Sequence, residues 1–260
     1  AYDSTIDRID YSNDTATAVA KGPLSTTAEA PAAAGNASYG WFAGGLKAPG
    51  AGQVRSIVDR LDYSSDTTAA AVKGPLSRVA YRITASGNTS YGYFSGGQPG
   101  TVSTVDRIDY SSDTPTAVAK GPLSAARYWH SAAGNASYGW HTAGNDPGIS
   151  SVDRIDYSND TATATPKGPL TTSNQTHGGT GNTSYGYFAG GYYGGDSYSK
   201  IDRIDFSSDT PTASPKGNLT VARREIGNTS NSSQANSLGS STVYPWYDTS
   251  GKGNNALITD

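Results

Sequence analysis

One short motif returns five times along the chain, and this repeat limits the possible folds more than any other feature. Asp-Arg-Ile-Asp-Tyr, or a close variant, starts at Asp7, Asp59, Asp106, Asp153 and Asp202, at intervals of 47 to 52 residues. A period of this length is typical of proteins in which each copy is one supersecondary unit. The fold is therefore predicted to consist of similar units placed side by side.

Further landmarks recur at fixed distances within each copy. Lys-Gly-Pro-Leu starts at Lys21, Lys73, Lys120 and Lys167, with Lys-Gly-Asn-Leu at Lys216. Gly-Asn pairs follow at 35–36, 87–88, 134–135 and 181–182, and a Tyr-Gly-aromatic run that usually ends in Gly-Gly comes next. Gly-Asn is a hairpin signal. In the third copy these signals divide the chain into four strands, over residues 126–133, 137–143, 152–157 and 161–166. Four short strands per unit are typical of a β-propeller blade.

The composition agrees with an all-β fold and excludes several classes of function. The 260 residues include 32 Gly and 18 Tyr but only 35% hydrophobic residues, which does not suit a Leu-rich helical bundle. The net charge is -3 with no basic stripe, so nucleic acid is not an expected partner. No apolar run is long enough for membrane insertion. The chain has no Cys and no Met and begins with Ala, which suggests a processed or partial chain.

The repeat resembles the kelch family. The residues that carry the resemblance are the run 91–97 (Tyr-Gly-Tyr-Phe-Ser-Gly-Gly), the strand 105–110, and Gly121-Pro122-Leu123 with Arg127 beyond it. The resemblance covers about residues 1–227 and implies a propeller of four-stranded blades. The Trp of the fourth kelch strand is missing in every copy, and Gly144-Asn145 breaks one double glycine. The near-identical Ser/Thr/Tyr/Gly-rich copies also resemble repeat-bearing structural proteins of marine bacteriophages.

The expected fold is an all-β, five-bladed β-propeller of four-stranded kelch-like blades. The chain starts inside a blade, so its N-terminal strands and C-terminal strands near 221–226 and within 236–249 are predicted to close the ring in one blade. This arrangement would remove an exposed sheet edge. Residues 1–240 then form the propeller. Residues 241–260 form a closing strand or a linker, because 246–255 resembles the opening of a lectin-like jelly-roll domain.

Three features of the repeat are predicted to be structural. Small residues at one register (Ala33, Ala85, Ala132 and Gly179) suit inner strands crowded around an axis. The aromatic series Trp41, Tyr93, Trp140 and Tyr187 is expected to pack between blades. The five Asp-Arg pairs could form a ring of ion pairs between neighbouring blades, since a motif copied in every blade is a poor candidate for catalysis.

The sequence offers little evidence for an enzyme. His130 and His177 occupy equivalent positions, and His141 lies on the strand after His130, but no acidic residue or Cys recurs at ligand spacing. A non-ligand role is favoured, with no metal and no cofactor. No Gly-x-Ser-x-Gly motif is present. The turn at 111–116 resembles a sialidase Asp-box but lacks its Gly and terminal aromatic residue, and it recurs as a turn between strands.

The copies differ mainly between the double glycine and the next Asp-Arg motif, and variable loops on a constant scaffold are where binding residues concentrate. The candidate ligand-binding residues from these loops are Tyr192, Tyr193, Tyr198, Lys47, Arg55 and Asp146. Trp129 and Arg82, at one register of the inner strand, form a second candidate near the axis.

These features predict a non-enzymatic recognition module. The phage resemblance implies a tail fibre or capsid appendage, located on a virion or extracellularly, that binds a host-surface glycan. A homo-oligomer is one expected assembly of such an appendage. Two alternatives remain open: a structural domain that docks other virion proteins, and, with least support, a glycan hydrolase with a site in the central channel.

Overall fold

The computed structural model describes residues 3–10, 13, 15–47, 53–145, 148–228 and 257–258. This part of the chain forms four four-stranded antiparallel sheets, three two-stranded sheets and one 3-10 turn at Tyr63–Ser65. None of its helices is long and apolar enough to cross a membrane. The predicted all-β class is confirmed.

Each large sheet comes from one continuous copy of the repeat. Sheet 1 contains β3 (Ala32–Gly35), β4 (Tyr39–Ala43), β5 (Val58–Asp62) and β6 (Ala71–Lys73). Sheet 2 contains β7 (Thr84–Gly87), β8 (Tyr91–Ser95), β9 (Val105–Asp109) and β10 (Val118–Lys120). Sheet 3 contains β11 (Ser131–Gly134), β12 (Tyr138–Thr142), β13 (Val152–Asp156) and β14 (Thr165–Lys167). Sheet 4 contains β15 (Gly178–Gly181), β16 (Tyr185–Ala189), β19 (Ile201–Asp205) and β20 (Ser214–Pro215).

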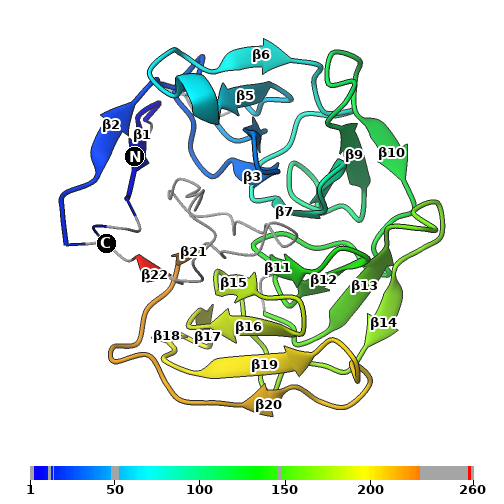
Figure 1. The fold of residues 1–260 in the computed structure, drawn as a ribbon. Coiled ribbons are helices and arrows are strands. Elements are labelled where there is room, and N and C mark those ends of the chain that lie inside the picture. Colours follow the sequence, from blue (N-terminus) through cyan, green and yellow to red (C-terminus); the bar gives the residue numbers. More distant parts are fainter. Residues whose placement is uncertain are drawn as a thin grey trace.

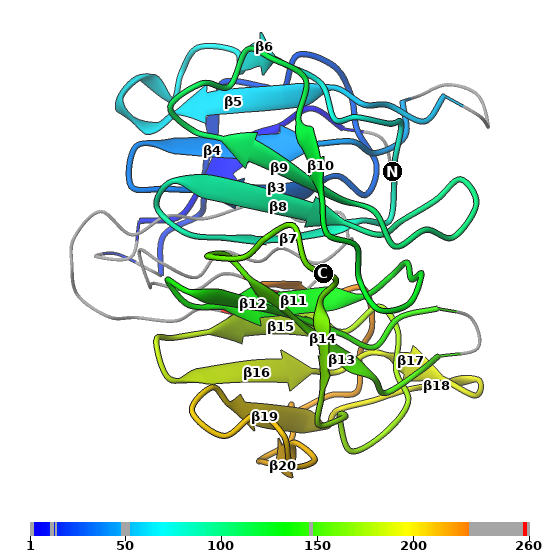
Figure 2. The same cartoon turned by 90° about the vertical axis from the view of Figure 1, so that its right-hand side faces the viewer.

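The four sheets are arranged around a common centre in a β-propeller-like fashion. Figure 1 shows the first strand of each sheet innermost and the fourth at the rim. The inner strands β3, β7, β11 and β15 pack consecutively against one another. From the side, the outer strands β10 and β14 face the viewer, and the hairpin of β17 (Tyr192–Tyr193) and β18 (Asp196–Ser197) extends to the right (Figure 2). The hairpin belongs to the variable loop of sheet 4.

Two strand pairs occupy the remaining sector. One is β1 (Ile6–Arg8) with β2 (Val19–Lys21), and the other is β21 (Gly227–Asn228) with β22 (Leu257–Ile258). β21 packs against the inner strand β15 (Figure 1). The paired C-terminal strand therefore starts one residue beyond the predicted 221–226. The second predicted stretch, 236–249, lies outside the described residues.

The Gly-Asn pairs form the turns between the first and second strands, as predicted. In sheet 3 the side-chain oxygen of Asn135 accepts hydrogen bonds from the backbone N–H groups of Ser137 and Tyr138, at 2.9 and 3.0 Å. This is an Asx turn, for which Asn is suited because its short amide reaches its own backbone. Its amide nitrogen donates to the carbonyl of Thr183 in the next sheet, at 3.5 Å. The Asn therefore fixes a turn and also contacts the neighbouring sheet.

The inner strands lie so close together that small residues are required. A Cβ atom added to Gly179 would lie 2.5 Å from Ser131 Oγ and 2.7 Å from the Ala132 carbonyl oxygen of the neighbouring strand. Ala85 and Ala132, at the same register, are fully buried. The prediction of a crowded inner layer is confirmed.

In sheets 2, 3 and 4, a carboxylate in the turn between the third and fourth strands binds three groups of the preceding sheet. Asp113 of sheet 2 accepts from Trp41 Nε1 at 2.9 Å and Arg60 Nη1 at 2.9 Å, and Lys73 Nζ lies 3.4 Å away. We call this arrangement the latch. It recurs at Asp160, with Tyr93, Arg107 and Lys120, and at Asp209, with Trp140, Arg154 and Lys167. Asp66 binds Arg8 and Lys21 in the same way.

The repeated Arg residues Arg8, Arg60, Arg107 and Arg154 form ion pairs between neighbouring sheets as predicted, but their carboxylate partners were wrongly assigned. Adjacent residues on a strand point to opposite faces, so Asp106 and Arg107 cannot share a partner. Arg107 binds the latch residue Asp160 at 2.7 Å. Asp106 instead accepts from the backbone N–H and the hydroxyl of Ser77, at 2.9 and 2.6 Å. The repeated Asp thus holds the connector that enters its own sheet.

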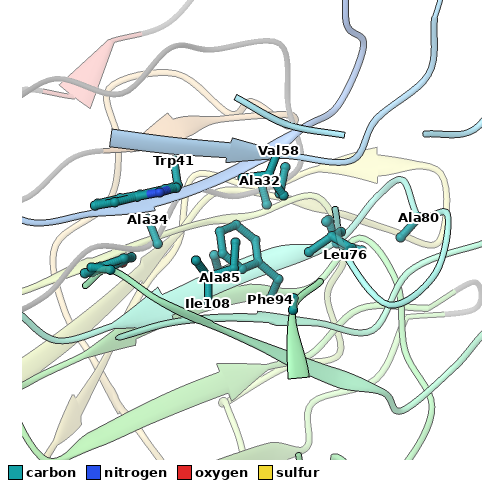
Figure 3. Packing of buried hydrophobic residues seen from close by; sticks show 13 residues of the cluster. Ala32, Ala34, Trp41, Val58, Leu76, Ala80, Ala85, Phe94 and Ile108 are labelled. Carbon is teal, nitrogen blue, oxygen red and sulfur yellow. The ribbon is translucent and has the colours of Figure 1, made fainter. Parts of the chain in front are cut away.

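Trp41, Tyr93 and Trp140 of the aromatic series pack between sheets as predicted. Trp41 stacks on Tyr110 of sheet 2 with ring centroids 3.9 Å apart, and Trp140 stacks on Phe206 of sheet 4 at 3.8 Å. Figure 3 shows Trp41 and Val58 of sheet 1 in one apolar cluster with Phe94 and Ile108 of sheet 2. The core therefore lies between the sheets, and each latch carboxylate binds at its border.

Asp160→Asn tests the latch. Asn cannot neutralise Arg107 and Lys120, so the free energy of unfolding should fall by about 2–4 kcal/mol in chemical denaturation at pH 7. Burial tends to raise the pKa of Asp160, but hydrogen bonds from Lys120 and Tyr93 and the charge of Arg107 outweigh it and lower the pKa. The carboxylate's contribution is therefore present above about pH 4 and is lost as the pH falls through the lowered folded-state pKa.

The control for this experiment is Asp196→Asn in β18, which is exposed and forms no ion pair within the described residues. It should change the free energy of unfolding by less than about 0.5 kcal/mol. Equal effects of the two substitutions would contradict the role given to the latch.

Candidate functional site at the inner collar

A strained backbone position precedes each inner strand. Five non-glycine residues there have positive φ angles: Ala30 (51°), Arg82 (56°), Trp129 (53°), Thr176 (54°) and Glu225 (58°). A left-handed conformation costs a residue with a Cβ atom roughly 1–2 kcal/mol. Backbone strain of this kind is concentrated at functional sites. We call these five residues the inner collar.

Backbone hydrogen bonds join the collar residues from one repeat to the next. The Trp129 N–H donates to the Arg82 carbonyl at 3.1 Å, the Thr176 N–H to the Trp129 carbonyl at 2.9 Å, and the Glu225 N–H to the Thr176 carbonyl at 2.8 Å. These bonds hold the side chains of successive copies together at one end of the inner strands. The backbone is constant while the side chains are apolar, cationic, aromatic, hydroxylic and anionic in turn, which suits a binding site.

Arg82 and Trp129, predicted as a pair, contact each other. The Arg82 guanidinium carbon lies 3.9 Å from the centroid of the Trp129 ring and 4.9 Å from that of Tyr81. One guanidinium nitrogen of Arg82 donates to Gln98 Oε1 at 2.8 Å. Both Arg82 and Trp129 are partly exposed. The cation–π contact fixes both planes, so the pair offers a preformed polar and aromatic surface.

Their position in the fold was wrongly predicted, because neither residue lies within a strand. Residues 126–133 were predicted as one strand, but β11 begins at Ser131. Residues 126–130 belong to the connector, in which the Arg127 N–H bonds to the Val102 carbonyl and the Trp129 N–H to the Arg82 carbonyl. The backbone of this connector therefore bonds to the preceding repeat and does not extend β11.

The three predicted tyrosines lie on and beside the β17–β18 hairpin. Tyr193 is 38% exposed, whereas Tyr192 and Tyr198 are partly buried. Tyr192 pairs with Gln175 of the connector and lies under Arg224, whose guanidinium carbon is 4.6 Å from the ring centroid. Tyr193 is therefore the most accessible aromatic side chain of this loop.

The remaining predicted loop residues have different positions. Lys47 is exposed, and Asp146 lies outside the described residues. Arg55 is only 7% exposed, so its prediction as a surface contributor is wrong. Its guanidinium donates to Thr26 Oγ1 and, at 2.9 Å, to the carbonyl of Gly44.

Arg55 belongs to a structural set that the sequence pattern concealed. In every large sheet a side chain donates a hydrogen bond to the backbone carbonyl of the first residue of the double glycine. In sheet 3 this residue is Ala143 in place of Gly. The donor–acceptor pairs are Arg55–Gly44, Arg78–Gly96, Arg127–Ala143 and Asn174–Gly190. Arg127 also forms a fully buried ion pair with Asp153 at 2.9 Å. The sequence pattern does not reveal these donors, because they lie at different positions within their repeats. The available signal is the register of Arg127, where Ala28 and Ala80 cannot donate, so another residue must supply the hydrogen bond in those repeats.

The three histidines are buried directly behind the collar. His130 follows Trp129 and His177 follows Thr176 in the chain, and His130, His141 and His177 are each at most 1% exposed. No cluster of three potential metal-ligating side chains occurs among the described residues. Burial is the main cause that lowers the pKa of His141 and of His177 to about 3, so both are neutral at physiological pH.

Thr176→Gly tests the strain at the collar. Thr is β-branched and is disfavoured at positive φ, whereas Gly adopts this conformation freely. The substitution should raise the free energy of unfolding, by up to about 1 kcal/mol after the entropy cost of Gly. Thr180→Gly, within β15 at an ordinary backbone conformation, should lower it. Equal losses in thermal denaturation would show that the collar is not strained.

No protein-family model and no curated protein matches the sequence. Among solved structures, the chain is similar to one titled "Structure of YjhT", with a TM-score of 0.69. The two are 10% identical in sequence, and the alignment covers 86% of each chain. At this identity the similarity concerns the fold alone, and it agrees with a β-propeller-like arrangement of four-stranded sheets.

Proposed function

We propose that this protein is a non-enzymatic recognition module whose binding surface consists of the accessible side chains of the inner collar, Arg82, Trp129 and Glu225, and the adjoining variable loops. The observation that carries the proposal is the collar itself. Its positive-φ backbone is repeated five times, hydrogen bonds join its members from Arg82 to Glu225, and its side chains differ in every copy. A structural requirement alone would be met by Gly at each position.

A glycan is the proposed ligand. Trp129 supplies an aromatic surface beside the hydrogen-bonding groups of Arg82 and Gln98, and Tyr193 supplies an exposed ring on the β17–β18 hairpin. Aromatic rings next to polar groups suit the apolar and hydroxylated faces of sugars. The resemblance to phage structural repeats suggests a virion appendage, where several copies would raise the avidity for a host surface.

A structural docking domain is the second candidate, and the outer rim favours it. Val19, Val72 and Val118 on the outer strands β2, β6 and β10 are 56%, 60% and 53% exposed. The corresponding strands β14 and β20 contain Pro166 and Pro215. Proline blocks pairing at a sheet edge, so the rim of the first repeats is more open to strand addition than that of the later ones. A hydrolase has less support, because the three histidines, His130, His141 and His177, are buried.

We further propose that the two strand pairs β1–β2 and β21–β22 form a fifth blade that closes the ring. Tyr187, Arg203 and Lys216 of sheet 4 occupy the positions of the latch donors, yet no carboxylate of the described residues binds Arg203 or Lys216. The repeat assigns the missing acceptor to Asp14, which lies outside the described residues.

Asp14→Asn should therefore lower the free energy of unfolding about as much as Asp160→Asn does. Asp10→Asn, in the same N-terminal repeat but outside the latch register, is the control. If Asp14→Asn leaves the denaturation midpoint unchanged while Asp160→Asn lowers it, the fifth latch does not form.

Trp129→Ala and Tyr193→Ala test recognition on a glycan array, followed by calorimetry with any glycan that binds. Each should weaken binding by about tenfold or more, as loss of a central aromatic contact does. Ala is compatible with the backbone at 129, because Ala30 has the same conformation in the first repeat. The control is Val72→Ala at the rim, which should not change glycan affinity.

The alternatives predict different outcomes of the same experiment. A folded protein that binds no glycan, but whose binding to another protein is abolished by Val72→Asp, would favour the docking domain. Turnover of a glycoside by the purified chain would refute the non-enzymatic proposal.

A further inference from the structure

Two of the contacts between neighbouring sheets are polar where the corresponding contacts are apolar. The residue that ends the second strand of one sheet lies near the residue that precedes the inner strand of the next. Ser95 Oγ lies 2.9 Å from His130 Nε2, and Thr142 Oγ1 lies 2.8 Å from His177 Nε2. The equivalent pairs elsewhere are Ala43 with Ile83 and Ala189 with Ile226. We call Ser95–His130 and Thr142–His177 the polar joints.

A third histidine extends the first polar joint. His141 occupies the position of Phe42, Phe94 and Phe188 in the other sheets. Its Nδ1 lies 2.8 Å from Ser95 Oγ and its Nε2 lies 2.9 Å from Ser86 Oγ. Ser86 occupies the position of Ala34. A whole apolar contact has thus been replaced by a chain of hydrogen bonds.

The hydrogen bonds of the chain require neutral histidines. His130 Nδ1 and His177 Nδ1 are buried without a partner among the described residues. A buried N–H without an acceptor is costly, so the proton of each ring belongs on Nε2, where it donates to Ser95 or Thr142. Ser95 then donates to His141 Nδ1, and His141 Nε2–H donates to Ser86. Protonation of His130 or His177 would place a charged, unsatisfied N–H in the interior.

The charged groups around the polar joints would not stabilise a protonated His130 or His177. Arg127 is buried beside them and donates to the carbonyl of His141, and its charge opposes a second positive charge nearby. Asp153, its ion-pair partner, already accepts from both Arg127 and Ser124. Tyr157, near Ser86, is kept neutral because burial raises its pKa. The ring of Phe188, 6.1 Å from that of His177, carries no charge.

We propose that the two polar joints make ligand binding at the inner collar sensitive to acid. This inference rests on the proposed function of the collar. His130 and His177 directly follow Trp129 and Thr176 in the chain. Protonation at mildly acidic pH requires these histidines to leave their buried positions, which displaces the adjoining collar residues. The collar is then assembled at neutral pH and opened locally in acid, between sheets 2, 3 and 4.

Acid is expected to favour the open state of the polar joints, because only that state takes up protons. Burial, followed by the charges of His141, Arg127 and His177, lowers the pKa of His130 well below its ordinary value, and burial lowers that of His177 to about 3. The closed state therefore stays neutral, and only the open state takes up protons below about pH 6.5. Lowering the pH from 7.5 to 5 should favour opening by about 30-fold for each histidine that becomes accessible.

Hydrogen–deuterium exchange on the ligand-free protein tests this proposal. After correction for intrinsic rates, segments 126–134 and 174–181 should exchange about 30-fold or more faster at pH 5 than at pH 7.5. Segment 28–35, which carries Pro31 at the register of His130 and contains no histidine, should not change. Equal acceleration of all three segments, or of none, would overturn the proposal.

A matched variant copies the apolar contacts from the other sheets. Ser86→Ala, Ser95→Ala, His130→Ile and His141→Phe replace the first joint, and Thr142→Ala with His177→Ile replaces the second. This protein should lose the acid-dependent exchange and retain its exchange at pH 7.5. Persistence of the acid effect would refute the role of the histidines. If the variant does not fold, Thr142→Ala with His177→Ile alone should remove the effect from segment 174–181.

Glycan binding at pH 7.5 and pH 5 separates this inference from the proposed function. Acid-dependent exchange without any glycan binding would contradict the recognition role but leave the acid-sensitive joints intact. Glycan affinity that is equal at both pH values would refute the regulation and support recognition.

Discussion

The carboxylate of the latch is the interaction on which the rest of the structure depends. Asp113, Asp160 and Asp209 each bind an indole or phenol, a guanidinium and an ammonium of the preceding sheet. A sheet with few Leu, Ile or Phe side chains buries little apolar area, so its attachment to the next sheet needs charge-assisted hydrogen bonds. The Gly of the Lys-Gly-Pro-Leu connector allows this approach, since a Cβ atom on Gly121 would lie 1.9 Å from the Ala162 carbonyl oxygen.

Because the latches attach neighbouring sheets to one another, the collar can adopt a strained backbone and its side chains can vary. The collar backbone is supported by hydrogen bonds between repeats, and each double-glycine position is held by a guanidinium or amide donor. Arg82, Trp129 and Glu225 of the collar are not buried in the core as Trp41 and Ile108 are. Positions 82, 129 and 225 can therefore differ in chemistry without loss of the fold, which is the condition for a binding surface on a repeat scaffold.

The buried contacts behind the collar also vary in chemistry on a constant backbone, since polar joints replace apolar contacts there. Ala43 with Ile83 and Ser95 with His130 occupy equivalent space, so both solutions fit one backbone. The polar solution adds sensitivity to protons because a buried imidazole must stay neutral. Its location directly behind Trp129 and Thr176 connects this sensitivity to the proposed binding surface.

The repeat by itself determined the division into four-stranded units and the Asn turns, because these depend on residues close together in the chain. It also predicted the crowding of the inner strands, because small residues recur at one register in four of the copies. It also brought Arg82 and Trp129 to one register. Only the tertiary structure decided that Arg107 binds Asp160, that Arg55 is buried, and that Trp129 lies in a left-handed connector. The positions of Arg107 and Trp129 depend on a partner from a neighbouring repeat, and that of Arg55 on Thr26 and Gly44 elsewhere in its own repeat. Nearly identical copies offer several chemically equivalent partners, and the packing of one sheet on the next selects among them.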